Sequence, residues 1–142
     1  MCEILECQEE IAERLNTVEE LELGGVKAFA EDSHAVIGDL ASWVQTGRTA
    51  IIVTTPTMTR NGASYSGEGI PCEMTLEIVC REKPALLRVA RNSGLMTALD
   101  AAICVARALD GTDYSFRSIR QQFDAVNGIL TATVEFNAQI GL

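Results

Sequence analysis

The side chains that could build a nucleophilic active site are sparse in this sequence. Nucleophilic catalysis pairs a serine, threonine or cysteine with a base, which is usually histidine, or a lysine or carboxylate in its place. His34 is the one histidine among the 142 residues, and its polar surroundings favour an exposed or helix-capping side chain. No G-x-S-x-G elbow is present either. The sequence therefore predicts no serine-hydrolase triad.

Two other patterns could do chemistry, and both are expected to be structural. Glu73 and Glu77 are four residues apart on the polar face of a predicted strand, which is typical of solvent-facing carboxylates rather than of an acid–base pair. The segment Ser66-Gly67-Glu68-Gly69 is rich in glycine but lacks the Gly-Lys-Ser/Thr that holds phosphate and Mg²⁺. We expect it to form a flexible hairpin tip.

The cysteines indicate free thiols in a reducing compartment. The sequence has five of them, an odd number with no C-x-x-C pair: Cys2, Cys7, Cys72, Cys80 and Cys104. The last three lie within apolar patterns, where free cysteine behaves as a small hydrophobic residue. A structural zinc site needs four closely spaced ligands, and His34 does not complete one. The sequence predicts neither a metal site nor a cofactor.

The charge is concentrated near the N-terminus. The formal net charge is −9, and residues 1–40 hold eleven acidic and two basic residues, whereas residues 41–142 hold nine of each. Such a chain is not expected to coat nucleic acid non-specifically, because that binding depends on neutralising phosphates. The acidic segment is either a solvated helix face or a surface that meets a basic partner.

One local cluster is basic. Arg81, Lys83, Arg88 and Arg91, against Glu82 alone, lie between a predicted strand and a predicted helix. This cluster is either a solvated loop or an electrostatic contact, with an acidic surface such as the N-terminal segment of a neighbouring subunit or with passing DNA. A chain with one acidic and one basic segment can associate head to tail, which closes into rings when the rotation allows.

The hydrophobic pattern predicts three helices and five strands around these residues. Helices are expected at 3–16, 33–44 and 95–109, and strands at 26–30, 49–59, 72–82, 114–124 and 129–138. Along 72–82 the apolar side chains alternate with polar ones, and Pro56 places strand 49–59 near an edge or a bulge. Asn127-Gly128 is typical of a tight hairpin turn.

The helix predicted over 95–109 is unusually apolar. Leu95, Leu99, Ile103, Ala106 and Leu109 form one stripe, and small apolar residues fill most of the remaining surface. Such a helix must be covered on more than one side, by the sheet and by the first helix or a neighbouring subunit. No apolar run reaches the ~18 residues of a membrane span, and the N-terminus does not read as a secretory signal.

Strands that follow directly on one another imply antiparallel pairing. The expected fold is therefore α+β, a single domain over residues 1–142 with a mostly antiparallel sheet and helices packed on one face. The order of elements resembles that of bacteriophage tail terminator, or tail completion, proteins. The likeness lies in the amphipathic segment from Ile4 to Leu15, the long-tipped hairpin from Ile51 to Cys80, the helix ending in Leu109-Asp110-Gly111 and the hairpin from Tyr114 to Ala138.

The resemblance implies a structural virion protein without enzymatic activity, a minor tail protein of a phage or prophage. Proteins of this family form a homo-oligomeric ring, commonly a hexamer, on the tail tube. The ring stops tube polymerisation and docks to the head–neck connector protein. Such a protein would be assembled in the bacterial cytoplasm and located in the virion tail, with tube protein, connector protein and passing DNA as its contacts and no membrane.

By the same analogy, the contact residues are expected in the loop 60–71 and the basic run 81–91. They are Arg60, Tyr65, Glu68, Arg81, Lys83, Arg88 and Arg91. Three other interpretations remain open: another neck or tail adaptor, a small α+β enzyme with a substrate beneath the loop 60–71, and a plain ligand-binding module. An apolar pocket with convergent polar groups would favour the last two.

Overall fold

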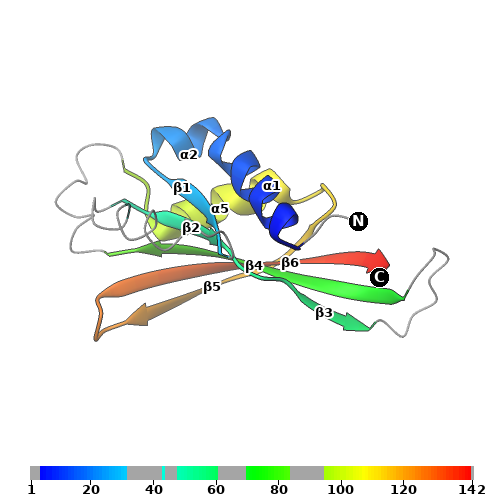
Figure 1. Ribbon diagram of the computed structural model, residues 1–142. Coiled ribbons are helices and arrows are strands. Elements are labelled where there is room, and N and C mark those ends of the chain that lie inside the picture. Colours follow the sequence, from blue (N-terminus) through cyan, green and yellow to red (C-terminus); the bar gives the residue numbers. More distant parts are fainter. Residues whose placement is uncertain (1–3, 32–42, 44–47, 61–69, 84–94, 142) are drawn as a thin grey trace.

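The computed structural model describes residues 4–31, 43, 48–60, 70–83 and 95–141. Its elements are α1 (Ile4–Asn16), α2 (Glu19–Leu23), β1 (Lys27–Ala30), β2 (Ala50–Val53), β3 (Thr57–Arg60), β4 (Pro71–Glu82), α5 (Ala98–Leu109), β5 (Ser115–Asp124) and β6 (Ile129–Gly141). The strands form one sheet in the order β1-β2-β4-β6-β5, and β3 also pairs with β4. The helices α1, α2 and α5 lie on the same face of the sheet (Figure 1). The predicted α+β class is confirmed.

The long antiparallel pair β4–β6 forms the centre of the sheet. Their register runs from Pro71 opposite Gly141 to Glu82 opposite Leu130, without interruption. Alternation along β4 follows the sequence prediction, because Leu76, Ile78 and Cys80 are buried toward the helices. Only β1 and β2 pair in parallel among the described strands. The predicted strands 72–82, 114–124 and 129–138 are thus confirmed as β4, β5 and β6 within one or two residues at most ends.

The strand predicted over 49–59 is divided in two, and the prediction of one continuous strand is wrong. β2 pairs with β4 as far as Val53, and β3 resumes the pairing at Thr57. The three residues 54–56 lie opposite only two residues of β4, 76–77, so the edge carries one extra residue. This is the arrangement of a β-bulge, and Pro56, which has no N–H to give to a ladder, lies within it.

The helices begin and end for local reasons. α1 confirms the amphipathic helix predicted at the N-terminus, and it buries Ile11 and Leu15. α2 was not predicted from the sequence, and it buries only Leu21. α5 begins at Ala98 rather than at residue 95, because the Thr97 side chain caps it by accepting a hydrogen bond from the Asp100 N–H at 3.2 Å.

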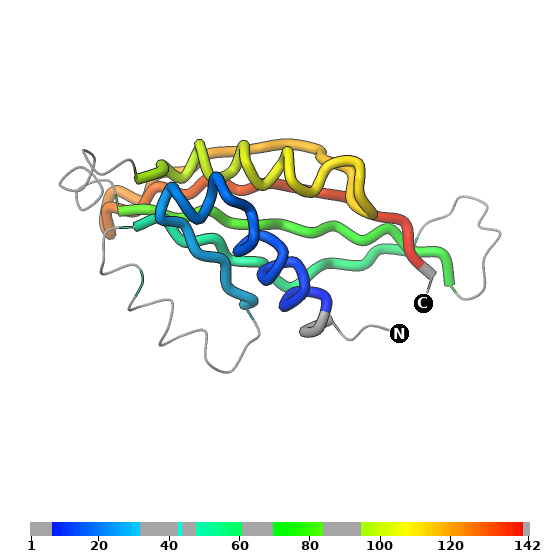
Figure 2. Tube along the Cα trace, turned by 90° about the horizontal axis from the view of Figure 1, so that it is seen from above, coloured from blue at the N-terminus to red at the C-terminus, as the bar shows by residue number. Residues whose placement is uncertain are grey.

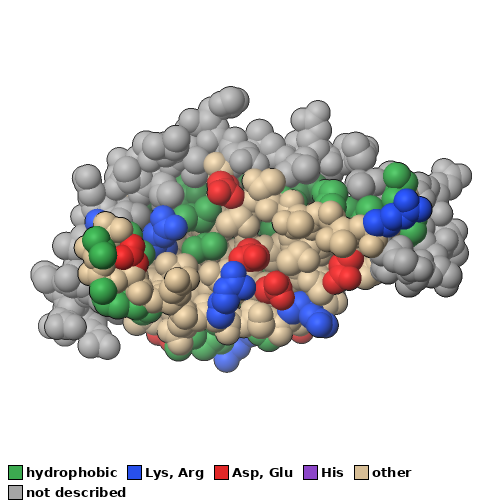
Figure 3. All heavy atoms as spheres, turned by 90° about the horizontal axis from the view of Figure 1, so that it is seen from below, with side chains coloured by type: hydrophobic (Ala, Val, Ile, Leu, Met, Phe, Trp, Pro, Cys, Tyr) green, Lys and Arg blue, Asp and Glu red, His purple; other side chains and the backbone are tan. Residues whose placement is uncertain are grey.

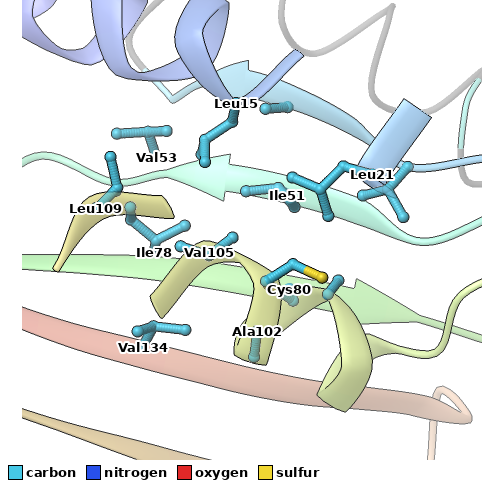
Figure 4. Packing of buried hydrophobic residues seen from close by; sticks show 14 of the residues in the cluster. Leu15, Leu21, Ile51, Val53, Ile78, Cys80, Ala102, Val105, Leu109 and Val134 are labelled. Atoms are coloured by element: carbon cyan, nitrogen blue, oxygen red, sulfur yellow. The ribbon is translucent and has the colours of Figure 1, made fainter. Parts of the chain in front are cut away.

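The core lies between the sheet and the helices, as Figure 4 illustrates. Leu15 and Leu21 descend from the N-terminal helices onto Ile51 and Val53 of β2, while α5 packs over Ile78 and its neighbours on β4 and β6. Seen from above in Figure 2, α5 runs along β4 and β6, and α1 crosses beside it over β1.

The buried face of α5 differs from the predicted stripe. Its buried side chains are mostly small, namely Ala98, Ala101, Ala102, Cys104, Val105 and Leu109. Leu99, Ile103 and Ala106 of the predicted stripe are only half-buried. Small side chains occupy the side of α5 that faces the sheet because they allow the helix axis to approach the strands closely. The larger side chains then lie on the flanks of the helix.

Candidate interaction surfaces

The predicted contact residues that the structure describes lie near the two ends of β4. Arg60 is exposed at the end of β3, beside the first residues of β4, whereas Arg81 and Lys83 lie at the opposite end of β4. Tyr65, Glu68, Arg88 and Arg91 lie outside the described residues, as do His34 and most of the helix predicted over 33–44. The described part of the set therefore belongs to two distant surfaces.

Arg81 belongs to a basic patch that sequence reasoning missed. Lys27, Ala50 and Arg81 stand in one row across β1, β2 and β4, and their side chains share the sheet face opposite α1, α2 and α5, which we call the helix-free face because none of these three helices covers it. Arg48 precedes β2 at the same end. We call Lys27, Arg48 and Arg81 the basic patch. Its members are 21 or more residues apart in sequence, so only the strand register reveals it.

An aromatic side chain holds two members of the basic patch in place. The Lys27 Nζ lies 5.9 Å and the Arg48 Cζ 5.4 Å from the ring centroid of Trp43, within the range of cation–π attraction. The Trp43 Nε1 donates to the Thr49 carbonyl oxygen at 2.9 Å, which fixes the ring. The Arg81 Nε is buried without a hydrogen-bond partner in the described structure. A buried N–H without an acceptor costs free energy, so an acceptor brought to it would be favourable.

The helix-free face of the sheet is otherwise polar and mixed in charge. Figure 3 shows acidic and basic side chains scattered among polar atoms over this face. The Arg120 guanidinium bonds to the Glu77 carboxylate at 2.8 Å across the strands. Glu77 is thus an ion-pair partner on an open surface, and Glu73 stands two pleats away on the same face. The structure does not bring these two carboxylates together around a reacting atom.

The acidic segment forms the outer surface of the N-terminal helices. Glu9, Glu10, Glu13, Glu19 and Glu22 are all exposed there. Exposed carboxylates keep their hydration, so the arrangement is that of a solvated helix face. A basic partner for this face stays a prediction.

The strand β5 is the most exposed element of the sheet. Only Ile119 of its ten residues is half-buried, and the others are exposed on both faces. Phe116 is 38% exposed, Phe123 57% and Val126, in the following turn, 93%. Exposed aromatic side chains at a sheet edge mark surfaces suited to contact with another chain.

The opposite edge of the sheet, at β1, is closed by a side chain. The Asn16 Nδ2 donates to the Ala28 carbonyl oxygen at 3.1 Å, and the Asn16 Oδ1 accepts from the Ala28 N–H at 2.8 Å. The amide thereby satisfies the same two backbone groups that another strand would use. Covering an edge in this way prevents unwanted strand addition.

The described cysteines are free, as predicted. Cys72, Cys80 and Cys104 are buried, and Cys7 is half-buried. Burial raises the pKa of the Cys80 thiol far above its usual value, and Cys104 adds to the shift. Burial also raises the pKa of Cys104, whose Sγ donates to Glu20 at 3.4 Å. No group of three or more His, Cys, Asp or Glu side chains able to hold a metal ion occurs among the described residues.

These shifts give a prediction for thiol chemistry. At pH 8, site-resolved alkylation followed by mass spectrometry should label Cys7 rapidly, and Cys80 and Cys104 only at the rate of unfolding. Above about pH 9 the unfolded chain releases thiol protons that the folded chain keeps, so the free energy of unfolding should fall as pH rises. Rapid labelling of Cys80 in the native protein would contradict the buried assignment.

Comparison with known proteins adds one finding on the fold. No protein-family profile matches the chain, and no curated protein sequence does. Among solved structures, the chain is similar to a protein chain from the virion of a native gene transfer agent (GTA) particle, with a TM-score of 0.58 and 15% sequence identity. The alignment covers 93% of this chain and 92% of that one. None of the described helices is long and apolar enough to cross a membrane. The chain therefore shares its fold, nearly from end to end, with a chain of that virion.

Proposed function

We propose that this protein is a structural component of a phage-like virion, and specifically a tail terminator. In that role, copies of the chain form a ring on the end of the tail tube, stop its polymerisation and dock to the head–neck connector. The observation that carries the proposal is the end-to-end fold similarity to a chain of the GTA virion. The order of elements, which resembles that of tail terminators, supports the finer assignment.

The distribution of surface features supports a role in assembly. An exposed acidic surface on α1 and α2 and a basic patch beneath β1, β2 and β4 lie on different parts of the molecule. Complementary charges on separate surfaces favour heterologous contacts, which build rings. The exposed strand β5 adds a surface suited to backbone pairing.

The direct test combines the purified chain with a tail tube protein from the same genome. Light scattering measures the mass of the chain alone, and electron microscopy with a labelled chain shows its position on assembled tails. We expect a ring at the head-proximal end of the tube, and tubes of limited length in its presence. Labelling at the opposite end would favour another tail adaptor, and no binding to virion components would refute the structural role.

The predicted basic run provides a mutational test of the same proposal. Replacing Arg81, Lys83, Arg88 and Arg91 with Ser should impair assembly onto tubes, and raised salt should do the same to the native protein. A variant with Arg14→Ser and Arg107→Ser, which alters exposed arginines elsewhere, serves as the control. Thermal unfolding must first confirm that both variants fold. Assembly of the fourfold variant at the native level would remove this run from the contact surface.

A further inference from the structure

Two strands of the sheet keep an open edge within the described residues. The continuous antiparallel run β3-β4-β6-β5 ends in β3 on one side and in β5 on the other. The first part of β5 is blocked, because the Phe116 N–H donates to Asp110 Oδ1 at 3.0 Å and a bulge follows. The remaining residues, 118–124, form what we call the open edge.

We propose that the open edge of one copy pairs with β3 of a second copy, so that the sheets of neighbouring subunits join. The proposal rests on the ring assembly proposed above and specifies the contact that builds it. Strand direction fits this contact. Neighbouring strands along β3-β4-β6-β5 alternate in direction, so in a ring β5 meets the next β3 in an antiparallel pair.

The stagger between the two edges also fits a closed ring. β3 lies beside residues 72–75 of β4, and the centre of the open edge, Gln121, lies level with Cys80. Along the strand direction, the centres of β3 and of the open edge are therefore about six residues apart, which is ~20 Å at ~3.3 Å per residue. Across the sheet, one subunit contributes four strand spacings, which span ~19 Å. If the subunits close into a flat ring, with each copy at the same height along the ring axis, this offset inclines the strands by about 45° to that axis. The angle is close to the strand tilt found in closed β-barrels.

The side chains of the two edges are compatible in this centred register. When the centres of the two edges are aligned, Thr57 comes opposite Gln122 of the second copy, and both side chains lie on the helix-free face. Met58 comes opposite Gln121, and both side chains lie on the helix side. The exposed ring of Phe123 then lies diagonally across from Met58, where a thioether–aromatic contact is favourable. The edge that the pairing does not use, β1, is the one closed by Asn16.

A second copy explains both open edges at once, whereas pairing of β5 with β5 explains only one. A β5–β5 contact is two-fold symmetric, closes on itself and leaves β3 unpaired. A β5–β3 contact joins different surfaces and repeats from copy to copy. The two arrangements predict different cross-links, which makes them separable by experiment.

The test uses two variants, Thr57→Cys and Gln122→Cys, that each add one exposed cysteine to a background with Cys2→Ser and Cys7→Ser, in which the remaining Cys72, Cys80 and Cys104 are buried. A short bismaleimide is added to the oligomer formed by the chain alone, or on tubes if the chain oligomerises only there. We expect cross-linked dimers from a mixture of the two variants, and a ladder of multimers from the double variant. Each single variant alone should give no dimer.

Each other outcome is decisive. A dimer from Gln122→Cys alone indicates a β5–β5 contact and overturns the proposal. A ring that forms without any cross-link overturns the contact but leaves the tail terminator function standing. If the variants cross-link as expected but the ring never binds tail tubes, the β5–β3 contact is supported and the tail terminator function is overturned. A chain that stays monomeric both alone and with tubes overturns both.

An apolar substitution gives an independent measure. Phe123→Ser should weaken association on the order of tenfold, because an exposed aromatic side chain that becomes buried against Met58 in a contact is usually a strong contributor. Val126→Ser is the matched control, since Val126 is more exposed but lies in the turn beyond the open edge. Circular dichroism should show that both variants fold. Equal association of the Phe123→Ser variant and the native chain would contradict the proposed edge contact.

Discussion

Phe136→Ala is expected to lower the free energy of unfolding by about 3–5 kcal/mol, because it cuts a fully buried aromatic ring back to a methyl group. Phe136 lies in the middle of β6, between Leu76 of β4 and Phe116 of β5, and none of its surface is exposed. Its ring meets that of Phe116 edge to face, with centroids 6.2 Å apart. Truncation removes this contact and leaves a cavity that the long β4–β6 pair cannot close. Urea denaturation followed by circular dichroism measures the loss.

Phe123→Ala is the matched control for this prediction. Phe123 lies on the same face of the neighbouring strand but is 57% exposed, so its truncation should cost less than about 1 kcal/mol in the isolated chain. Similar losses for the two variants would mean that β6 is not the buried centre of the sheet.

Glu82→Ala is expected to lower the free energy of unfolding by about 1.5–3 kcal/mol, because it removes a hydrogen bond to a charged group at a helix N-terminus. Glu82 is only 4% exposed, and its Oε2 accepts from the Ala98 N–H, the first of α5, at 3.2 Å. The carboxylate thus couples the end of β4 to the start of α5. Thermal and urea unfolding measure the effect.

Two further variants separate charge from hydrogen bonding at this position. Glu82→Gln keeps an acceptor oxygen and should recover part of the loss, whereas Glu135→Ala, on the helix-free face, should change stability by less than about 0.5 kcal/mol. Full stability of the Glu82→Ala variant would show that α5 does not depend on this cap.

The periodicity of apolar residues was enough to predict those helices and strands that have one clear apolar face. β4, β6 and α1 each alternate or repeat with one clear apolar face, and the structure confirms them. The predicted stripe of α5 was wrong in part, because an almost entirely apolar helix has no unique face in its sequence. The close approach of α5 to the sheet decides that the alanines are buried and that Leu99 and Ile103 are only half-buried.

The features that depend on distant partners could not be predicted in this way. The closure of the β1 edge joins Asn16 to Ala28, and the cap on α5 joins Glu82 to Ala98. The basic patch arises from strand register between segments that are far apart in sequence. For the same reason, the sequence does not show that Arg60, expected in the loop 60–71, and Arg81, expected in the basic run 81–91, lie beside opposite ends of the twelve-residue strand β4.

The extra residue at 54–56 shifts the alternation of side chains between the two faces of the sheet by one position from β2 to β3. Val53 points toward the helices, and strict alternation would turn the residue at position 57 the same way. With the insertion, Met58 takes that orientation, and Thr57 and Thr59 turn to the helix-free face. One backbone irregularity thus divides a single stretch of sequence between two tasks. Its first half packs in the hydrophobic core, and its second half presents the hydroxyl groups of Thr57 and Thr59 on the opposite face of the sheet.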